Sequence, residues 1–183
     1  MEFLNFALII GKLKKLKRAG WVRRKIPDAE SVAGHSFRLT VLVLFFAVKA
    51  GVDQVKAVKM ALIHDLGEAE IGDIVTRSGR ETLSNLSDKI QKERKALESI
   101  LSLTDSKEYI QLFDEYEKNS SPEAQLVRQL DKLEMGIQAL EYEREYGMDL
   151  EEFFETCRED IKNEELLKVL DEMERLRRKK RRV

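Results

Sequence analysis

The sequence is poor in cysteine and long apolar runs, and each scarcity excludes a class of protein. Its single cysteine, Cys157, excludes an internal disulfide framework and fits a reducing compartment, so we expect a cytoplasmic protein. The longest apolar run, 39–48 apart from Thr40, is too short for a bilayer, which needs about 20 residues. The apolar start of the chain carries Glu2 where a signal peptide would be positive, so we interpret it as an amphipathic helix and expect no membrane partner.

An excess of charge of either sign is also missing. The formal net charge is −1, although charged residues make up 37% of the chain. A protein that is basic overall and built for polymeric nucleic acid is therefore disfavoured. Both signs are interleaved, as on the solvated faces of helices. A length of 183 residues favours one domain.

Apolar residues recur at helical spacing along most of the chain, and no alternating pattern is strong enough to predict a sheet. We therefore predict an all-α protein, a single-domain helical bundle. Loops are expected at 21–29, which contains Pro27, and at 76–80. The predicted helices cover residues 2–18, 53–65, 81–101, 106–117, 122–146, 149–157 and 164–178. One more helix, capped by Asp28 or Ser31, is predicted to run to about Ala50.

The strongest chemical signal is a cluster of polar residues that directly follows an apolar helix. His64 and Asp65 end this helix, and Glu68 and Asp73 come soon after. Carboxylates near buried residues are unfavourable unless they are paired or bound to a cation. A lone histidine on an apolar face is usually a core residue, but imidazole with carboxylate is also a common set of metal ligands.

Two further residues interrupt apolar helices in the same way. His35, the other of the two histidines, shares an inward-facing stripe with Leu39 and Leu42. Asp131 lies at the border of the apolar stripe of 122–146. An aspartate at a buried helix edge is often only paired with a lysine or arginine, so the residue alone leaves both interpretations open.

Four ordered segments resemble one family, the HD-domain metal-dependent phosphohydrolases. They are Arg-Ala-Gly-Trp at 18–21, Glu-Ser-Val-Ala-Gly-His-Ser at 30–36, His-Asp-x-x-Glu-x-x-x-Gly-Asp-Ile at 64–74, and Gln-Leu-Asp-Lys at 129–132 with Gln-Ala at 138–139. The flanking residues are most similar to the HD-domain 5′-deoxynucleotidases. The resemblance runs from about Leu4 to Tyr146. It implies a single HD domain with a motif core at about 30–146, C-terminal helices at 149–178 and a basic tail at 179–183.

The resemblance implies a metal site, and the residue types fit one. Its ligands would be two imidazoles and two carboxylates: His35, His64, Asp65 and Asp131. Mixed nitrogen and oxygen ligands suit Mn²⁺, Fe²⁺, Co²⁺, Ni²⁺ or Zn²⁺ and disfavour Ca²⁺. Such an ion would lower the pKa of a bound water towards about 7 and stabilise charge on phosphoryl oxygens.

The resemblance also implies roles around that ion. Glu68 would pass a proton to the leaving 5′-oxygen and Asp73 would orient the attacking water. Arg18 would bind the substrate phosphate, with Arg23 and Arg24 as alternatives, because Gly20 stands where some family members have the arginine. Trp21 would form a wall at the sugar's C2′ edge, unless it simply covers the core, which is the commoner fate of a tryptophan.

The sequence is therefore interpreted as that of a hydrolase that removes phosphate from deoxyribonucleoside 5′-monophosphates. Two alternatives remain: another HD-type nucleotide phosphohydrolase or phosphodiesterase, or a non-catalytic helical interaction module. By analogy with the family we also expect a homodimer, for which the apolar side of the C-terminal helices offers a surface.

Overall fold

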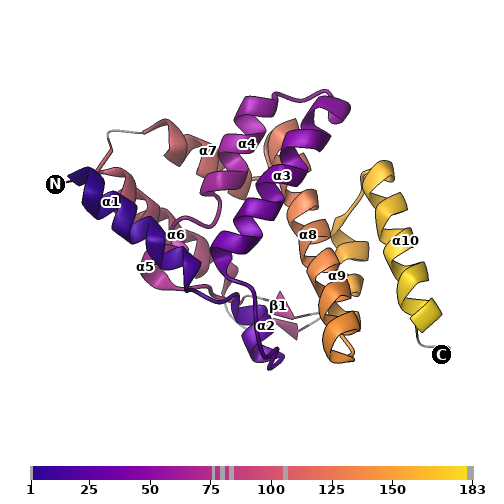
Figure 1. Cartoon of the computed structure of the whole chain (residues 1–183). Helices are drawn as coiled ribbons and strands as arrows, with labels where there is room; N and C mark the ends of the chain where they lie inside the picture. Colours follow the sequence, from indigo (N-terminus) through magenta and orange to yellow (C-terminus); the bar gives the residue numbers. More distant parts are fainter. Residues whose placement is uncertain (1, 76, 79–80, 83–84, 105–106, 181–183) are drawn as a thin grey trace. The chain divides into compact units, whose positions relative to one another are not determined.

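The computed structural model describes residues 2–75, 77–78, 81–82, 85–104 and 107–180 (Figure 1). The chain forms two compact units, Met1–Val127 and Arg128–Val183, and each is described by itself. The prediction of a single domain is not tested by this division and stays a prediction.

The first unit is built from short and medium helices. Its elements are α1 (Glu2–Gly11), the 3₁₀ helix η1 (Lys12–Lys14), α2 (Ala19–Arg23), α3 (Val32–Ala50), α4 (Gln54–Ile63), α5 (Glu68–Ile71), α6 (Leu86–Leu101) and α7 (Glu108–Glu117). Strands β1 (Arg77–Ser78) and β2 (Glu81–Thr82) pair antiparallel, with Arg77 opposite Thr82. Helix α8 (Pro122–Tyr146) continues into the second unit, which also holds α9 (Glu151–Asp160) and α10 (Glu164–Lys180). The all-α class is confirmed.

Helix α3 forms where the sequence predicts it, and its ends explain why. The Ser31 side chain accepts a hydrogen bond from the backbone N–H of Gly34 at 3.1 Å, and Gly51 ends the helix in the left-handed region at φ 70°. By length and composition alone, α3 is the one helix in the described part of the chain that could cross a membrane. Core helices meet the same criterion, and α3 has a buried stripe: Val32, His35, Leu39, Val43 and Ala47.

The first helix is shorter than predicted. Instead of continuing to Arg18 it ends at Gly11, and η1 follows. The next backbone groups pair with the segment before α3: Arg18 N–H donates to Glu30 O at 3.0 Å, and Val32 N–H donates to Leu16 O at 2.8 Å. This pairing satisfies the backbone without a helix and fixes residues 16–18 beside the start of α3. The predicted loop at 21–29 is wrong at its start, because α2 covers 19–23.

The charged helix predicted from Glu81 also begins later. Asn85 caps α6 by accepting from the N–H groups of Ser87 and Asp88, and β2 occupies 81–82. Part of the predicted loop at 76–80 is strand β1. Residues 76, 79–80, 83–84 and 105–106, and the basic tail from 181 onward, lie outside the described residues.

Each unit has buried apolar residues of its own. In the first, Val32, Leu97, Ile100 and Phe113 are fully buried in one apolar cluster with Ile63, Leu66 and Ala69. In the second, the apolar residues of α9 and α10 are buried: Phe154, Cys157, Leu166, Leu170 and Met173. Much of the apolar side of the C-terminal helices, expected as a dimer surface, is buried, Leu176 is 38% exposed, and the dimer itself stays a prediction.

Candidate metal centre and active site

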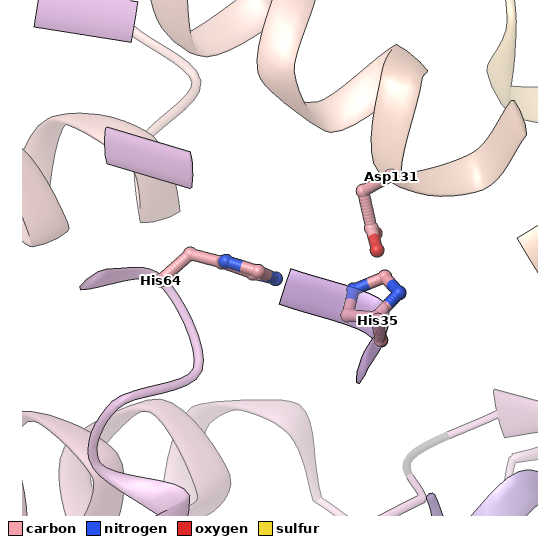
Figure 2. A group of neighbouring side chains, drawn as sticks. All are labelled: His35, His64 and Asp131. Carbon is pink, nitrogen blue, oxygen red and sulfur yellow. The ribbon is translucent and has the colours of Figure 1, made fainter. Parts of the chain in front are cut away.

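Both histidines are buried in the first unit and come from different helices. His35 lies in the first turn of α3, and His64 follows the last residue of α4. Their ring centroids are 5.5 Å apart, and Figure 2 shows the two imidazoles. The Nδ1 of His64 lies 2.9 Å from the carbonyl oxygen of Ala61. Since a carbonyl only accepts, Nδ1 carries the proton and Nε2 is left with a lone pair.

Three side-chain nitrogen atoms lie close to one oxygen of Asp65. Its Oδ2 lies 3.1 Å from His64 Nε2, 3.8 Å from His35 Nε2 and 3.1 Å from Arg18 Nη1, which donates to it. Burial alone would raise the pKa of Asp65, but its interactions with His64, with the Arg18 cation and with His35 outweigh burial and hold that pKa below its usual range. Asp65 is therefore a carboxylate at neutral pH, with two imidazole nitrogens close to one of its oxygens.

The Glu68 carboxyl group begins α5 and is 1% exposed. Burial raises its pKa to about 11, and the nearby carboxylates of Asp65 and Asp73 push it the same way, against the lowering effect of Arg18 and Lys89. Its Oε2 is buried and has no hydrogen-bond partner among the described residues. Glu68 is therefore a buried carboxyl group that holds its proton at neutral pH.

Close packing against α6 fixes the backbone that carries Glu68. A side chain at Gly67 would place its Cβ 2.6 Å from the carbonyl oxygen of Glu93, closer than atoms can approach. Glycine at this position lets the turn between α4 and α5 lie directly on the backbone of α6. Glu93 is itself buried on α6, so the two glutamates belong to elements in direct contact.

Asp73 and Trp21 both stabilise the segment that holds Arg18. The Oδ2 of Asp73 accepts a hydrogen bond from the Ala19 N–H at 2.7 Å, at the start of α2. Trp21 is 2% exposed, and its indole N–H donates to Glu30 Oε1 at 2.8 Å. The structure thus places Trp21 in the interior beside the site segment, and its predicted contact with a sugar stays a prediction.

Asp131 lies on α8, in the second unit. It is 6% exposed, and Lys132 Nζ lies 2.8 Å from its Oδ2. Val127, one helical turn earlier, is fully buried in the first unit. Residues four apart share one face of a helix, so α8 presents Asp131 on the same face as Val127.

Two residues near Glu68, Lys89 and Glu93, were not predicted from the sequence to belong to the site. Lys89 Nζ lies 3.9 Å from Glu68 Oε1 and 3.3 Å from Glu93 Oε1. Their spacing is the only local signal in the sequence. Lys89 and Glu93 are four residues apart, on the helix face that also carries the buried residues Ala96, Leu97 and Ile100. That pattern predicts an ordinary surface ion pair, and only the tertiary structure adds the second glutamate.

The residues of the first unit fit a divalent transition metal. The His64 tautomer leaves Nε2 available as a ligand, and a backbone carbonyl holds its ring in place, which is the usual arrangement for metal-binding histidines. The Nε2 atom of His64 is buried without a hydrogen-bond partner among the described residues. A carboxylate and two imidazoles around one point are typical of sites for Mn²⁺, Fe²⁺, Co²⁺, Ni²⁺ or Zn²⁺.

The fold and the site together define an all-helical protein with a buried histidine–aspartate cluster suited to a metal. The family model described as "HD domain" matches residues 10–176, and the chain belongs to that family. The chain is 38% identical over 174 residues to the 5′-deoxynucleotidase HDDC2 of Danio rerio, covering 92% of this chain and 84% of that protein. It is 37% identical over 178 residues to the 5′-deoxynucleotidase HDDC2 of Dictyostelium discoideum, covering 86% and 88%.

A solved structure has the same fold. The PH0347 protein from Pyrococcus horikoshii superposes with a TM-score of 0.75 at 35% identity, and the match covers 94% of this chain and 99% of that one. The likeness extends over almost the whole length of both chains, so the helical architecture, and not only the motif segments, is shared.

Proposed function

We propose that this protein is a metal-dependent phosphohydrolase that converts deoxyribonucleoside 5′-monophosphates to deoxynucleosides and phosphate. The observation that carries the proposal is the buried cluster of His35, His64 and Asp65, with the protonated Glu68 and the cationic Arg18 beside it. Relatives named 5′-deoxynucleotidases, at 37–38% identity over most of both chains, support it. A buried carboxylic acid next to a metal site therefore disfavours the alternative of a non-catalytic helical interaction module.

The proposed ligands are His35, His64, Asp65 and Asp131. The first three lie together in the first unit. Asp131 is proposed because it matches the family's motif and because α8 presents it on the face of the buried Val127. When bound, the ion supplies a polarised water and positive charge for the phosphoryl oxygens. Which transition metal is native is left to elemental analysis of the purified protein.

Three side chains would then bind the phosphate, orient the water and supply the proton. Arg18 presents a planar set of donors suited to phosphate oxygens, and its contact with Asp65 places it at the cluster. Asp73, which already accepts a hydrogen bond at the start of α2, would orient the attacking water. Glu68 would donate its proton to the 5′-oxygen as the bond from phosphorus to that oxygen breaks, so that the deoxynucleoside leaves as a neutral alcohol.

Selectivity for the sugar tests the proposal directly. We expect kcat/KM for dAMP to exceed that for AMP by about 5- to 150-fold, because a 2′-hydroxyl crowded against an apolar wall has no hydrogen-bond partner. The buried indole of Trp21 is the proposed wall, so Trp21→Ala should narrow the gap, whereas Trp21→Phe, which keeps an apolar ring, should preserve it. Equal values for the two nucleotides in the unmodified protein would instead support a broader HD-type phosphohydrolase or phosphodiesterase.

We also propose a homodimer, formed by the exposed apolar stripe on α3. The stripe contains Phe37, Val41, Leu44, Phe45 and Val48, opposite the buried stripe of the same helix. Phe45→Asp should lower the mass in sedimentation equilibrium from dimer to monomer, because a charge would be buried in the contact. Phe3→Asp on α1, equally exposed but outside the stripe, is the control and should leave the dimer intact. A monomeric unmodified protein would contradict the proposal.

The cytoplasm is the proposed location. The support is the single cysteine, which is buried as a free thiol and forms no disulfide.

A further inference from the structure

Lys89 is a largely buried cation that the proposed reaction does not yet use. Its side chain is 19% exposed, and its ammonium nitrogen lies between two buried carboxyl groups, 3.3 Å from Glu93 Oε1 and 3.9 Å from Glu68 Oε1. A buried ammonium is unfavourable without compensating charge. Burial would lower the pKa of Lys89, but the nearby carboxylates, Glu93 first and then Asp65, outweigh it and raise that pKa. Lys89 therefore remains a cation.

The backbone holds Lys89 and Glu68 at a fixed separation. Helix α6, which carries Lys89, packs on α5, which Glu68 begins. The contact between Gly67 and the Glu93 carbonyl leaves no space for either element to move towards the other. The distance between the backbones that carry Lys89 and Glu68 is therefore set by the fold.

The two carboxyl groups around Lys89 lie at different distances from its ammonium. Glu93 is the nearer one, at 3.3 Å, and Glu68 is 3.9 Å away. Glu68 is the acid of the proposed reaction, so it gains a negative charge beside the cation when its proton leaves.

We propose that Lys89 is a positioning residue that holds the Glu68 carboxyl group and stabilises the carboxylate that forms when Glu68 gives its proton to the leaving oxygen. This inference rests on the proposed function. In that step the O–H bond of Glu68 breaks and an O–H bond forms on the 5′-oxygen, so one negative charge passes from the leaving oxygen to Glu68. The ammonium of Lys89 lies 3.9 Å from that new charge. Without it, the product of the proton transfer would be an uncompensated buried anion.

The first test compares lysine variants on α6. Lys89→Met should lower kcat for dAMP by about 10- to 100-fold, the usual effect of removing a group that orients a functional residue. KM and the metal content should stay within about twofold, and Lys89→Arg, which keeps the cation, should recover part of the rate. Lys92→Met, at an exposed position of the same helix, is the control and should match the unmodified protein. Loss of metal or of helical circular dichroism in Lys89→Met would overturn the proposal and make the lysine a purely structural residue.

The second test asks whether Lys89 acts through Glu68. In a Glu68→Gln background there is no proton to transfer, so adding Lys89→Met should cause no further fall in kcat. Multiplicative losses in the double variant would overturn the role of Lys89. Near-normal turnover of Glu68→Gln by itself would instead contradict the role proposed for Glu68, and absence of hydrolysis by the unmodified protein would contradict the proposed function, so the three failures are distinguishable.

Discussion

Glu68→Gln is expected to keep the metal and the fold and to lose about 10²- to 10⁴-fold in turnover of dAMP, the usual range for a general acid. Glutamine has nearly the same shape but no acidic proton, and the position is 1% exposed, so an isosteric change disturbs the packing least. The measurements are kcat and the metal content of the purified variant. Retained metal with near-normal turnover would give Glu68 a structural role, and loss of metal would make it a ligand.

The matched comparison is His64→Ala. His64 contributes an imidazole nitrogen 3.1 Å from Asp65, and its removal should abolish tight metal binding and hydrolysis together. Unchanged metal content in His64→Ala would exclude the proposed site. The pair of variants therefore separates the residues that bind the ion from the residue that supplies the proton.

The raised pKa of Glu68 also gives the metal-free protein a predictable pH dependence. The folded state holds this proton more tightly than the unfolded chain, because the pKa is about 11 in the fold against 4.5 for a free glutamate. The contribution to the free energy of unfolding is therefore complete at low pH and is lost progressively as the pH rises from about 4.5 towards 11. Glu68→Gln has no such proton, so its unfolding should depend less on pH over this range.

The largest expected loss of stability is at Arg177, in the second unit. Its guanidinium donates to both oxygens of Glu143 at 2.7 Å and to Glu151 Oε2 at 2.9 Å, and it lies 3.7 Å from the centre of the Phe154 ring. The side chain is 6% exposed. Arg177→Met should lower the free energy of unfolding by about 3–5 kcal/mol, because it leaves buried carboxylate without its partner.

The neighbouring Arg178 provides the control. Its side chain is 77% exposed and contacts Glu174 at 3.5 Å, so Arg178→Met should change the free energy of unfolding by no more than about 0.5 kcal/mol. Urea unfolding of the two variants under one set of conditions gives the comparison. Equal midpoints would mean that the ion pairs of Arg177 contribute no more than an ordinary surface contact.

The sequence predicts much of the fold where local signals agree with tertiary packing. Helix α3 was predicted to begin after Asp28 or Ser31 and to end at about Ala50, and Ser31 is the residue that caps it. Ser31 and Gly51 are strong end signals with a periodic apolar stripe between them. The prediction for α1 was wrong beyond Gly11, since the same apolar spacing continues past the point where the backbone turns to pair with residues 30–32. That pairing joins segments distant in sequence, and periodicity carries no information about it.

The candidate site was predictable in its residue types but not in its contacts. Family motifs identify His64, Asp65 and Glu68, and the structure brings these residues together. The role of Lys89 depends on α6 lying against the turn at Gly67, a contact between residues 21 or more apart that no local pattern indicates. Arg177 shows the same limit: it stands among charged residues at the end of the predicted helix 164–178, yet it is buried.

The single tryptophan and the single cysteine give each unit a natural spectroscopic or chemical reporter. Trp21 is buried in the first unit, so its fluorescence follows the opening of that unit alone. Cys157 is buried in the second, where its thiol donates to the Lys132 carbonyl oxygen and burial raises its pKa to about 12. A thiol reagent can therefore react only after the second unit opens, and its labelling rate measures that event. The cooperativity of the two units can thus be measured on the unmodified chain, without an introduced label.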